Sequence, residues 1–407
     1  MSVTLSAEDE RARDVIRQAV LLVLSATLIL TVIGIVMVFS ATSVTSISQA
    51  LVYDNPAARF AEAQRQLTFG IVGLILLPIA AWITPRFYER FAWPIFIAGI
   101  GLQLLVLTPL GMSSRGNNNW VNIGGFTLQP SEFLKLAAAL WLAVMVGRLA
   151  KSDMSDMRKV AMPAGAGALI ALGGVLAGRD MGTAIIFVLM YGVLFWLAGI
   201  PGRWVAIIAI CVAVVAVLLI AMEPSRLNRV ADYAENIFIT PDVYDPTQSE
   251  YAMWAFGTGG IGGVGLGASR EKWNYLPEAH NDFIFAVIGE ELGLAGCFAI
   301  IILFVVLGFG LFRIATHHRD RWVRYFVAMI AVWLTGQALL NMMVVTGVLP
   351  VFGVPLPFIS QGGSSLIACL LAVGVVLSMA LRQPGVAQSL RLSKTAFKSV
   401  ATVRSTK

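Results

Sequence analysis

Residues 276–286 place Glu278, His280 and Asp282 directly before an apolar run. A carboxylate at the start of a helix can act as its N-cap, because it accepts hydrogen bonds from free backbone N–H groups and meets the positive end of the helix dipole. A carboxylate held at a membrane surface can also act as a general base toward a lipid-linked substrate. Both interpretations apply to Asp282, which is the candidate catalytic residue.

Charged residues also lie inside apolar runs. Glu290 follows Asp282 by eight residues. On a helix it would lie about 12 Å deeper and on nearly the same face. Lys135 follows Pro130 early in a different run. Because a charge at this depth is costly, it is usually paired or functional. The sequence leaves two interpretations open: a buried Glu290–Lys135 ion pair that fixes helix register, or a catalytic role.

Further polar residues have the chemistry to contact an anionic or sugar-containing substrate. Arg226 and Arg229 lie three residues apart and would share one face of a helical turn. Arg179 and Asp180 lie between two apolar runs. Arginines can clamp phosphate oxygens, although anchoring at lipid headgroups is the alternative. Trp120 follows a polar loop, where an indole suits the membrane interface or stacks on a sugar.

Two uncharged segments are rich in glycine or proline, which indicates turns or loops. The glycine-rich stretch 257–267 has no Gly-Lys-Ser/Thr ending and no strand–helix context, so it predicts a close-packed turn or a flexible loop and not a nucleotide site. Residues 355–365 are uncharged and interrupted by proline and glycine. They are too broken for a membrane span and predict a short re-entrant turn packed within the protein.

The amino-acid composition indicates the class of protein in which these residues are positioned. The 407 residues are 58% hydrophobic and 13% charged, whereas soluble domains carry about 25% charged residues. The composition therefore excludes soluble domains, disorder and coiled coil, and indicates a polytopic membrane protein. The three cysteines lie in apolar runs, which excludes a disulfide framework and a cysteine-based zinc site.

Apolar runs of about 20 residues predict an all-α fold with ten transmembrane helices. The boundary near residues 179–182 is short, and the run at 283–311 is long enough to tilt or to extend beyond the bilayer. The predicted spans are 19–41, 66–84, 91–109, 131–149, 161–178, 182–200, 204–222, 283–311, 326–347 and 364–381.

The distribution of Lys and Arg predicts the orientation. With ten spans, most of these residues fall on the side that holds both termini, so both termini are expected in the cytoplasm. The net charge of +6 is therefore an orientation signal, and no nucleic-acid partner is expected. We expect a cytoplasmic tail (1–18) without a removable signal peptide, a single membrane domain (19–382) with a large outer loop (223–282), and a basic cytoplasmic tail (383–407).

Several motifs, in this order, resemble the SEDS family (shape, elongation, division and sporulation), which includes FtsW, RodA and SpoVE. The sequence GEELG at 289–293 and the polar tails are most similar to the FtsW branch. Five positions depart from the family pattern. Asn119 replaces an Arg, with Arg115 the nearest cation, and Gly178-Arg179 replaces Gln-Pro. Asn281 replaces Thr, and Gln361 replaces Tyr. The matching stretches are QPSEFLK (129–135), DMGT (180–183), RLNR (226–229), QSEYA (248–252), LPEAHNDFIFA (276–286) and PLPFISQGGSS (355–365).

The resemblance implies a peptidoglycan glycosyltransferase that polymerises lipid II at the outer face of the bacterial cytoplasmic membrane, at the division septum. The family's essential acid corresponds to Asp282, and a single such carboxylate suits one displacement with inversion. The diphosphate charge would be offset by arginine or by a divalent cation, Mg²⁺ or Mn²⁺. The candidate substrate-binding residues are Arg229, Arg226, Arg179, Asp180, Lys135, Glu290, Trp120, His280, Gln248, Ser364 and Ser365.

The resemblance also implies partners: a class B penicillin-binding transpeptidase, other divisome proteins and membrane lipid. No nucleotide, haem or flavin is expected. Two other function classes stay open. A lipid II flippase would depend most on Lys135 and Glu290, although no inverted repeat of broken spans is evident. A scaffold that recruits the transpeptidase would tolerate polar substitutions throughout the large outer loop.

Overall fold

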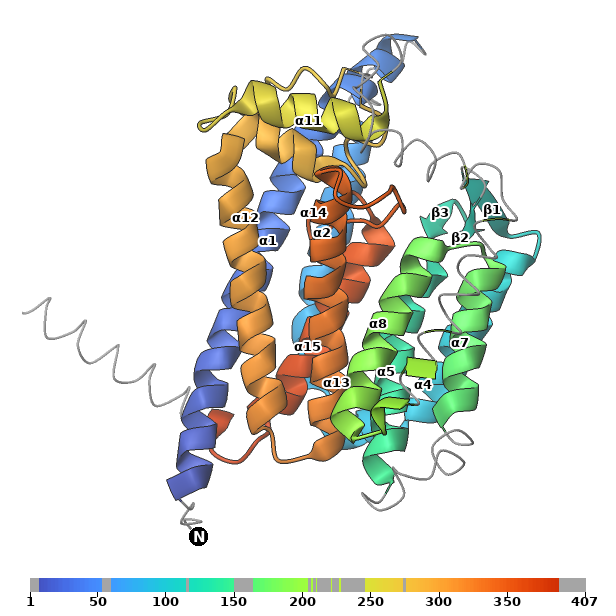
Figure 1. The fold of residues 1–407 in the computed structure, drawn as a ribbon, viewed down its shortest axis with the longest axis vertical. Coiled ribbons are helices and arrows are strands. Elements are labelled where there is room, and N and C mark those ends of the chain that lie inside the picture. The colour runs from blue at the N-terminus through green and yellow to red at the C-terminus, as the bar shows by residue number, and fades with distance from the viewer. Residues whose placement is uncertain are drawn as a thin grey trace, which may run out of the picture.

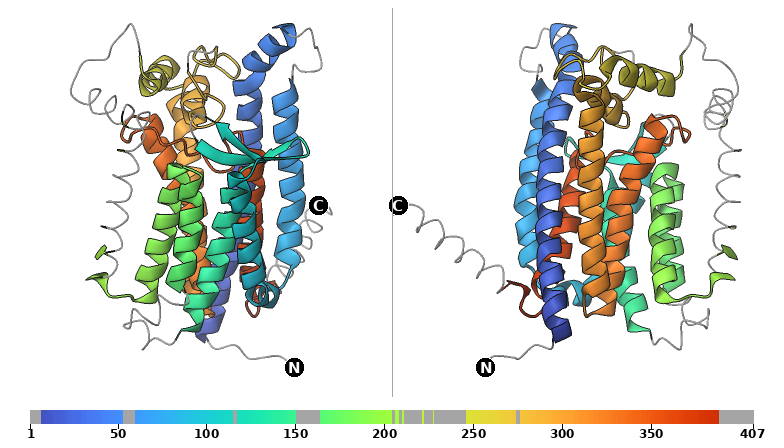
Figure 2. Two further views of the ribbon diagram at one scale, coloured as in Figure 1. Left: turned by 90° about the vertical axis from the view of Figure 1, so that its right-hand side faces the viewer. Right: turned by 60° about the vertical axis from the view of Figure 1, so that its left-hand side comes forward.

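The computed structural model describes residues 7–52, 60–114, 117–149, 164–203, 246–273 and 276–387, with a few positions between 206 and 227. The chain is mostly helical. Its long helices run side by side as a bundle, and the first described helix, α1 (Ala7–Val52), begins at one end of the bundle (Figure 1). A small sheet and the crosswise helix α11 lie at the other end, which we call the sheet end (Figures 1 and 2).

Seven helical stretches in the described part are long and apolar enough to cross a membrane, and two shorter apolar helices accompany them. The elements are α1 (Ala7–Val52), α2 (Ala61–Trp82), α3 (Pro85–Arg90), α4 (Ala92–Leu104) with η2 (Leu105–Leu107), α5 (Pro130–Arg148), α7 (Ala166–Ala177), α8 (Met181–Ala198), α11 (Gln248–Gly259), α12 (Ile284–His317), α13 (Arg321–Ala331), η5 (Val332–Gly336), α14 (Gln337–Val345) and α15 (Gly363–Leu381).

Most of the predicted spans coincide with these helices. The short boundary predicted near residue 180 is confirmed, because α7 ends at Ala177 and α8 begins at Met181. The predicted span 204–222 lies almost entirely outside the described residues. The structure thus confirms a multi-pass helical architecture, whereas the count of ten spans stays a prediction.

A three-stranded antiparallel sheet departs from the predicted all-α fold. It comprises β1 (Gly111–Ser114), β2 (Asn117–Ile123) and β3 (Phe126–Leu128), in the order β1-β2-β3. Membrane spans are predicted from long apolar runs, and these short polar strands contain no such run. Since β3 leads through Gln129 directly into α5, the sheet is fixed to a buried helix.

The helix α12 is interrupted, which the sequence interpretation of one long span did not anticipate. Gly293 has φ +68° and ψ −168°, a backbone conformation that favours glycine. The glycine-rich loop after α11 packs against this break: Leu294 N donates to Gly260 O, and a Cβ added to Gly263 would lie 2.2 Å from Glu291 O. The predicted close-packed turn is therefore confirmed.

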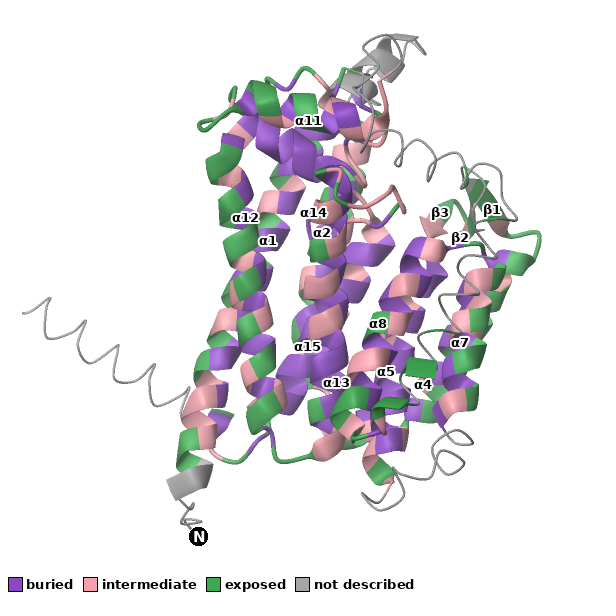
Figure 3. Ribbon diagram, in the orientation of Figure 1, coloured by how far each residue is buried: buried purple, intermediate pink, exposed green. Residues whose placement is uncertain are grey.

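The bundle core lies along α5 and α15, the most deeply buried of the membrane-length helices (Figure 3). Helix α15 packs on α2, and α12 packs on α1. Before α15, residues 350–362 have no regular helix or strand, and Leu356, Phe358 and Ile359 within them are almost fully buried. This confirms the prediction of a turn packed within the protein.

The close contact between α1 and this buried segment gives a stability prediction. A Cβ added to Gly34 would lie 2.2 Å from Phe358 O and 2.7 Å from Ile359 Cα, both backbone atoms. Gly34→Ala should lower the free energy of unfolding by about 1–3 kcal/mol, because backbone cannot move aside as a flexible side chain can. Thermal unfolding in detergent measures the loss.

Gly101→Ala is the matched control. Gly101 also lies in a helix, but a Cβ there meets nothing within 4 Å. This variant should keep or raise stability by up to about 1 kcal/mol, since alanine favours helix over glycine. Equal stability of the two variants would contradict the packing described for residues 350–362.

Candidate active site

Two adjoining cavities open at the sheet end. The larger, about 340 Å³, we call the arginine cavity, and the smaller, about 100 Å³, the carboxylate cavity. They share four lining residues, Trp120, Asn281, Gln361 and Gly362. The arginine cavity is also lined by Thr42, Glu62, Arg65, Gln66, Phe69, Thr127, His280 and Gly363, and the carboxylate cavity by Asn119, Gln129, Gln248, Glu278, Asp282, Val351, Gly353, Pro355 and Ser365.

Asp282 lines the carboxylate cavity from a turn that precedes α12. The N-cap of α12 is Phe283, without a side-chain cap, so the predicted N-cap role of Asp282 is wrong. The reason is a tight turn that begins at Glu278, whose φ is +58°. The carbonyl of Glu278 accepts hydrogen bonds from Asn281 N (2.9 Å) and Phe283 N (3.2 Å) and delays the start of the helix.

The main chain of this turn is tied to neighbouring segments. Ser360 Oγ donates to Asn281 O (2.8 Å), and Gln361 N donates to His280 O (3.0 Å). Asn341 Nδ2 donates to Asp282 O (2.7 Å). These bonds fix the backbone from which the Asp282 carboxylate extends. Sequence reasoning missed Asn341, because an isolated Asn in an apolar run gives no spacing signal.

Arg65 supplies the charge of the arginine cavity. It is the only Lys or Arg among the described residues that line either cavity. Its guanidinium lies 5.9 Å from the centre of the Phe69 ring and donates a hydrogen bond to Thr127 Oγ1. Sequence reasoning missed this residue too, because a lone arginine before a span reads as a membrane-interface anchor. Only the fold brings it beside His280.

Four of the predicted substrate-binding residues line the cavities. Trp120, on β2, lines both, and His280 lines the arginine cavity. Gln248 and Ser365 line the carboxylate cavity, and Gln248 Nε2 also donates to Pro277 O (2.6 Å). These four residues come from a strand, a turn and the first turns of α11 and α15, and the fold brings them together.

Asp180 is buried outside the cavity linings. It is the N-cap of α8 and accepts hydrogen bonds from Thr183 N (3.0 Å), Gln129 Nε2 (3.0 Å) and Asn119 Nδ2 (3.3 Å). Ser364 Oγ accepts a hydrogen bond from Gln129 N (3.0 Å). Asp180 and Ser364 therefore connect the sheet, α5, α8 and α15, which form the walls on that side.

The predicted arginines outside the linings are of two kinds. Arg179 is exposed, has φ +59° and lines neither cavity. Arg226 and Arg229 lie outside the described residues, as does Arg115. Substrate contacts by these arginines stay predictions.

The predicted Glu290–Lys135 pair is wrong. Lys135 Nζ lies 2.9 Å from Glu132 Oε1 on its own helix and donates to Gln337 Oε1 (2.8 Å). It also lies 4.7 Å from the centre of the Trp333 ring. Glu132, three residues before Lys135 on the same face of α5, is the ion-pair partner that we expected Glu290 on α12 to be.

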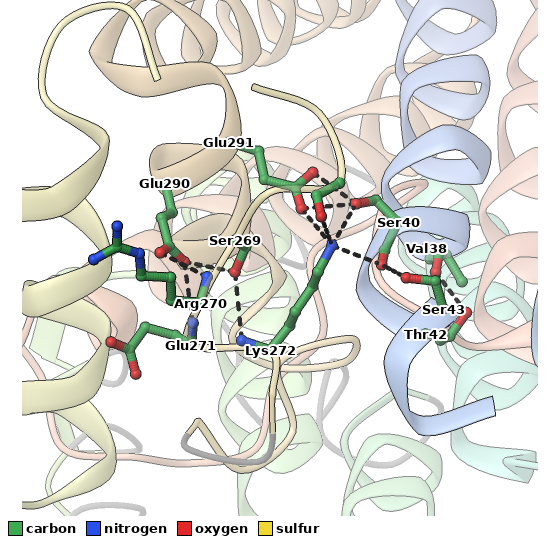
Figure 4. Close-up of polar contacts among 11 residues, drawn as sticks. Val38, Ser40, Thr42, Ser43, Ser269, Arg270, Glu271, Lys272, Glu290 and Glu291 are labelled. Atoms are coloured by element: carbon green, nitrogen blue, oxygen red, sulfur yellow. Dashed lines mark hydrogen bonds and ion pairs between the residues drawn. The ribbon is translucent and has the colours of Figure 1, made fainter. Parts of the chain in front are cut away.

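Glu290 and Glu291 instead anchor the loop after α11 (Figure 4). Glu290 accepts hydrogen bonds from Ser269 Oγ (2.5 Å) and Arg270 N (2.9 Å). Glu291 pairs with Lys272 Nζ at 3.0 Å. Burial and the nearby charge of Glu290 raise the pKa of Glu271 above its ordinary value. This network holds the segment that leads to Asp282.

The Lys272–Glu291 pair gives a second prediction. Both side chains are almost fully buried, so Lys272→Met or Glu291→Met alone leaves an uncompensated charge and should cost about 3–5 kcal/mol of stability. The double variant should cost less than the sum of the two single losses. Chemical denaturation in detergent measures this coupling.

The exposed pair Arg148–Glu89 (3.5 Å) is the control, with side chains 55% and 38% exposed. Methionine substitutions there should show a coupling of about 0.2–1 kcal/mol. Strictly additive losses at Lys272 and Glu291 would refute the buried pair.

Comparison with known proteins agrees with the motif resemblance. A family model of cell cycle proteins, named for FtsW, RodA and SpoVE, matches residues 20–384. A probable peptidoglycan glycosyltransferase FtsW of Mycobacterium tuberculosis is 35% identical over 378 residues, covering 92% of this chain and 70% of the relative. A protein of the same name from Trichlorobacter lovleyi is 36% identical over 365 residues, covering 88% and 92%.

Solved structures show the same fold. A chain from a peptidoglycan synthase complex that coordinates polymerization and crosslinking matches with a TM-score of 0.69 and 25% identity, covering 90% of this chain and 98% of that one. The rod shape determining protein RodA of Thermus thermophilus matches with a TM-score of 0.63 and 24% identity, covering 89% and 96%. The chain therefore belongs to the FtsW, RodA and SpoVE family of cell cycle proteins.

Proposed function

We propose that this protein is a peptidoglycan glycosyltransferase that polymerises lipid II. The observation that carries the proposal is the pair of adjoining cavities, one lined by Asp282 and the other by Arg65 together with Glu62. The names of the relatives from Mycobacterium tuberculosis and Trichlorobacter lovleyi support the same reaction class. A polymerase must bring the reacting groups of two lipid-linked sugars together, and two cavities with a shared wall offer adjoining places for these groups.

The reaction is one displacement at an anomeric carbon. The 4-hydroxyl of the acceptor sugar attacks the anomeric carbon of the donor, and its proton passes to the Asp282 carboxylate. The bond from the anomeric carbon to the diphosphate oxygen breaks, and the lipid diphosphate leaves with the electron pair. Asp282 acts as the general base, and attack opposite the leaving group inverts the configuration.

The charges assign the two substrates to the two cavities. A diphosphate carries negative charge, so a described lining with two carboxylates, Glu278 and Asp282, and no Lys or Arg disfavours it. The arginine cavity has one carboxylate, Glu62, and the Arg65 guanidinium, which can bind diphosphate oxygens directly. We therefore place the donor diphosphate in the arginine cavity and the acceptor hydroxyl in the carboxylate cavity. Trp120, which lines both, offers a ring face on which a sugar can stack.

A divalent cation, Mg²⁺ or Mn²⁺, is compatible with these residues. The described residues contain no group of three or more His, Cys, Asp and Glu side chains that would hold a metal alone. Mg²⁺ is commonly bound by one or two carboxylates together with substrate phosphates, and Glu62 lines the cavity that we assign to the diphosphate. We propose that a cation binds only with the substrate and supplies charge neutralisation to the diphosphate.

We further propose the predicted setting: ten spans, both termini in the cytoplasm, and an active site on the outer face at the division septum. Residues 19–382 would form the membrane domain, with the outer loop 223–282 presenting Arg226 and Arg229. Membrane lipid and divisome proteins would surround it. The similarity to a chain of a complex that coordinates polymerization and crosslinking supports a class B transpeptidase as partner.

The contacts of Lys135 and Glu290 favour a polymerase over a lipid II flippase. A flippase path would use intramembrane charges that face the moving headgroup. Lys135 bonds to Glu132 and Gln337, and Glu290 bonds to the loop after α11. Neither residue lines a cavity described above.

The proposal predicts distinct effects for the two cavity carboxylates. Asp282→Asn should lower the rate of glycan formation from labelled lipid II by about 10²–10⁴-fold, because it removes the base without changing side-chain shape. Glu278→Gln should lower it far less, since this residue shapes the turn through a bond from Asn281 Nδ2 (3.1 Å). The assay uses the full chain with its transpeptidase and a divalent cation.

If Glu278→Gln lowered the rate far more than Asp282→Asn, the general base would be Glu278. Equal activity of wild type and both variants would remove general-base catalysis from this cavity. Absence of polymer even from wild type, in the presence of the partner, would favour flipping or scaffolding, which a liposome flipping assay then tests.

Arg65 gives a further prediction. Arg65→Gln should lower kcat/KM for lipid II by about 10–100-fold, the loss expected for one charge-assisted hydrogen bond, and Arg65→Lys should lose less. Arg313→Gln is the matched control, because Arg313 also lies over a phenylalanine ring and donates to a side-chain oxygen, but near the N-terminal end of α1. Equal losses at Arg65 and Arg313 would contradict a substrate contact at Arg65.

A further inference from the structure

Asn341 joins the two segments that form the carboxylate cavity. It lies in α14 and is 1% exposed. Its Nδ2 donates to Asp282 O and to Val354 O, each at 2.7 Å. One side-chain amide thus uses both of its N–H groups on carbonyls that lie 72 positions apart in the sequence, one in the turn before α12 and one in the irregular segment before α15.

The spacing of these two segments determines the surroundings of the Asp282 carboxylate. Gly353, next to Val354, has φ +72°, and a Cβ added there would lie 3.4 Å from Asp282 Oδ2. The carboxylate therefore lies against the Gly353 backbone. A change in the distance between the two carbonyls bonded by Asn341 moves the carboxylate relative to this wall.

The turn before α12 is bonded to other segments at three successive residues. Asp282 is the last of the three and directly precedes Phe283, the N-cap of α12. The other long-range bonds of the turn, from Ser360 and Gln361, reach Asn281 and His280. The bond from Asn341 is made to Asp282 itself.

We infer that Asn341 is a positioning residue for Asp282: its amide clamps the Asp282 and Val354 carbonyls and thereby holds the base beside the acceptor hydroxyl. The inference rests on the proposed function for its effect on the reaction, whereas the clamp itself is independent of it. Only a side chain with two N–H donors at this position can bond both carbonyls. Leucine has a similar size and no donor.

The test compares Asn341→Leu with wild type in the full chain, together with its transpeptidase. A displacement of about 1 Å at a reacting group can cost about 100-fold in rate. We expect kcat for glycan formation to fall by about 100-fold with KM changed by less than about threefold, because the cavity walls that bind the sugar remain.

Gln103→Ala is the matched control for loss of a buried amide. Gln103 is 2% exposed, its Nε2 donates to Gly174 O (3.2 Å), and its Oε1, like Asn341 Oδ1, has no hydrogen-bond partner among the described residues. It lies between α4 and α7 and lines neither cavity. This variant should lose thermal stability and keep kcat. Full kcat in Asn341→Leu, or a kcat loss no larger than that of Gln103→Ala, would overturn the inference.

Hydrogen exchange provides a readout that does not need activity. Asn341→Leu should speed amide exchange in residues 280–286 and 351–356, and Gln103→Ala should leave both segments unchanged. If wild type forms no polymer, the proposed function fails, and faster exchange in these two segments still supports the clamp. Unchanged exchange in Asn341→Leu refutes the clamp, whatever the activity of wild type.

Discussion

The structure depends on hydrogen-bond partners for the backbone N–H and C=O groups of residues 350–362, an irregular segment buried within a helix bundle. Without water, each of its buried polar groups needs a partner from the chain itself. Side-chain amides supply several: Gln337 Nε2 donates to Pro355 O (2.8 Å), Asn341 Nδ2 to Val354 O (2.7 Å) and Gln66 Nε2 to Ser360 O (3.4 Å). These amides come from α2 and α14, so the segment is held between helices that are distant in sequence.

The same bonds explain how the candidate site is built. Lys135 is held between Glu132 and Gln337, and Gln337 in turn bonds to Pro355 O. A buried ion pair thus supports the segment that faces Asp282. Asp282 lies in a turn before α12, and a tertiary hydrogen bond from Asn341 holds its main-chain carbonyl. Lys135 and Glu290, the charged residues on which a flippase would depend, thus have structural roles: Lys135 supports the segment 350–362, and Glu290 anchors the loop after α11.

Hydropathy and composition were sufficient to predict most of the helical bundle, and the uncharged, proline-broken stretch predicted the buried turn. The cavity lining was predicted in part, through Asp282, Trp120 and His280. The partner of Lys135 and the cavity position of Arg65 depend on the relative placement of distant helices, which periodicity does not encode. The small sheet was missed because its strands are short and polar, and a turn that begins at Glu278 with positive φ shifted the start of α12.

The most direct test of lipid II binding in these two cavities is a cryo-electron microscopy structure of the Asp282→Asn variant with lipid II bound. We expect a diphosphate oxygen within hydrogen-bond distance of the Arg65 guanidinium and, from a second lipid II molecule, a sugar hydroxyl within hydrogen-bond distance of the side chain at position 282. Lipid II bound elsewhere on the helices, with both cavities empty, would contradict this expectation.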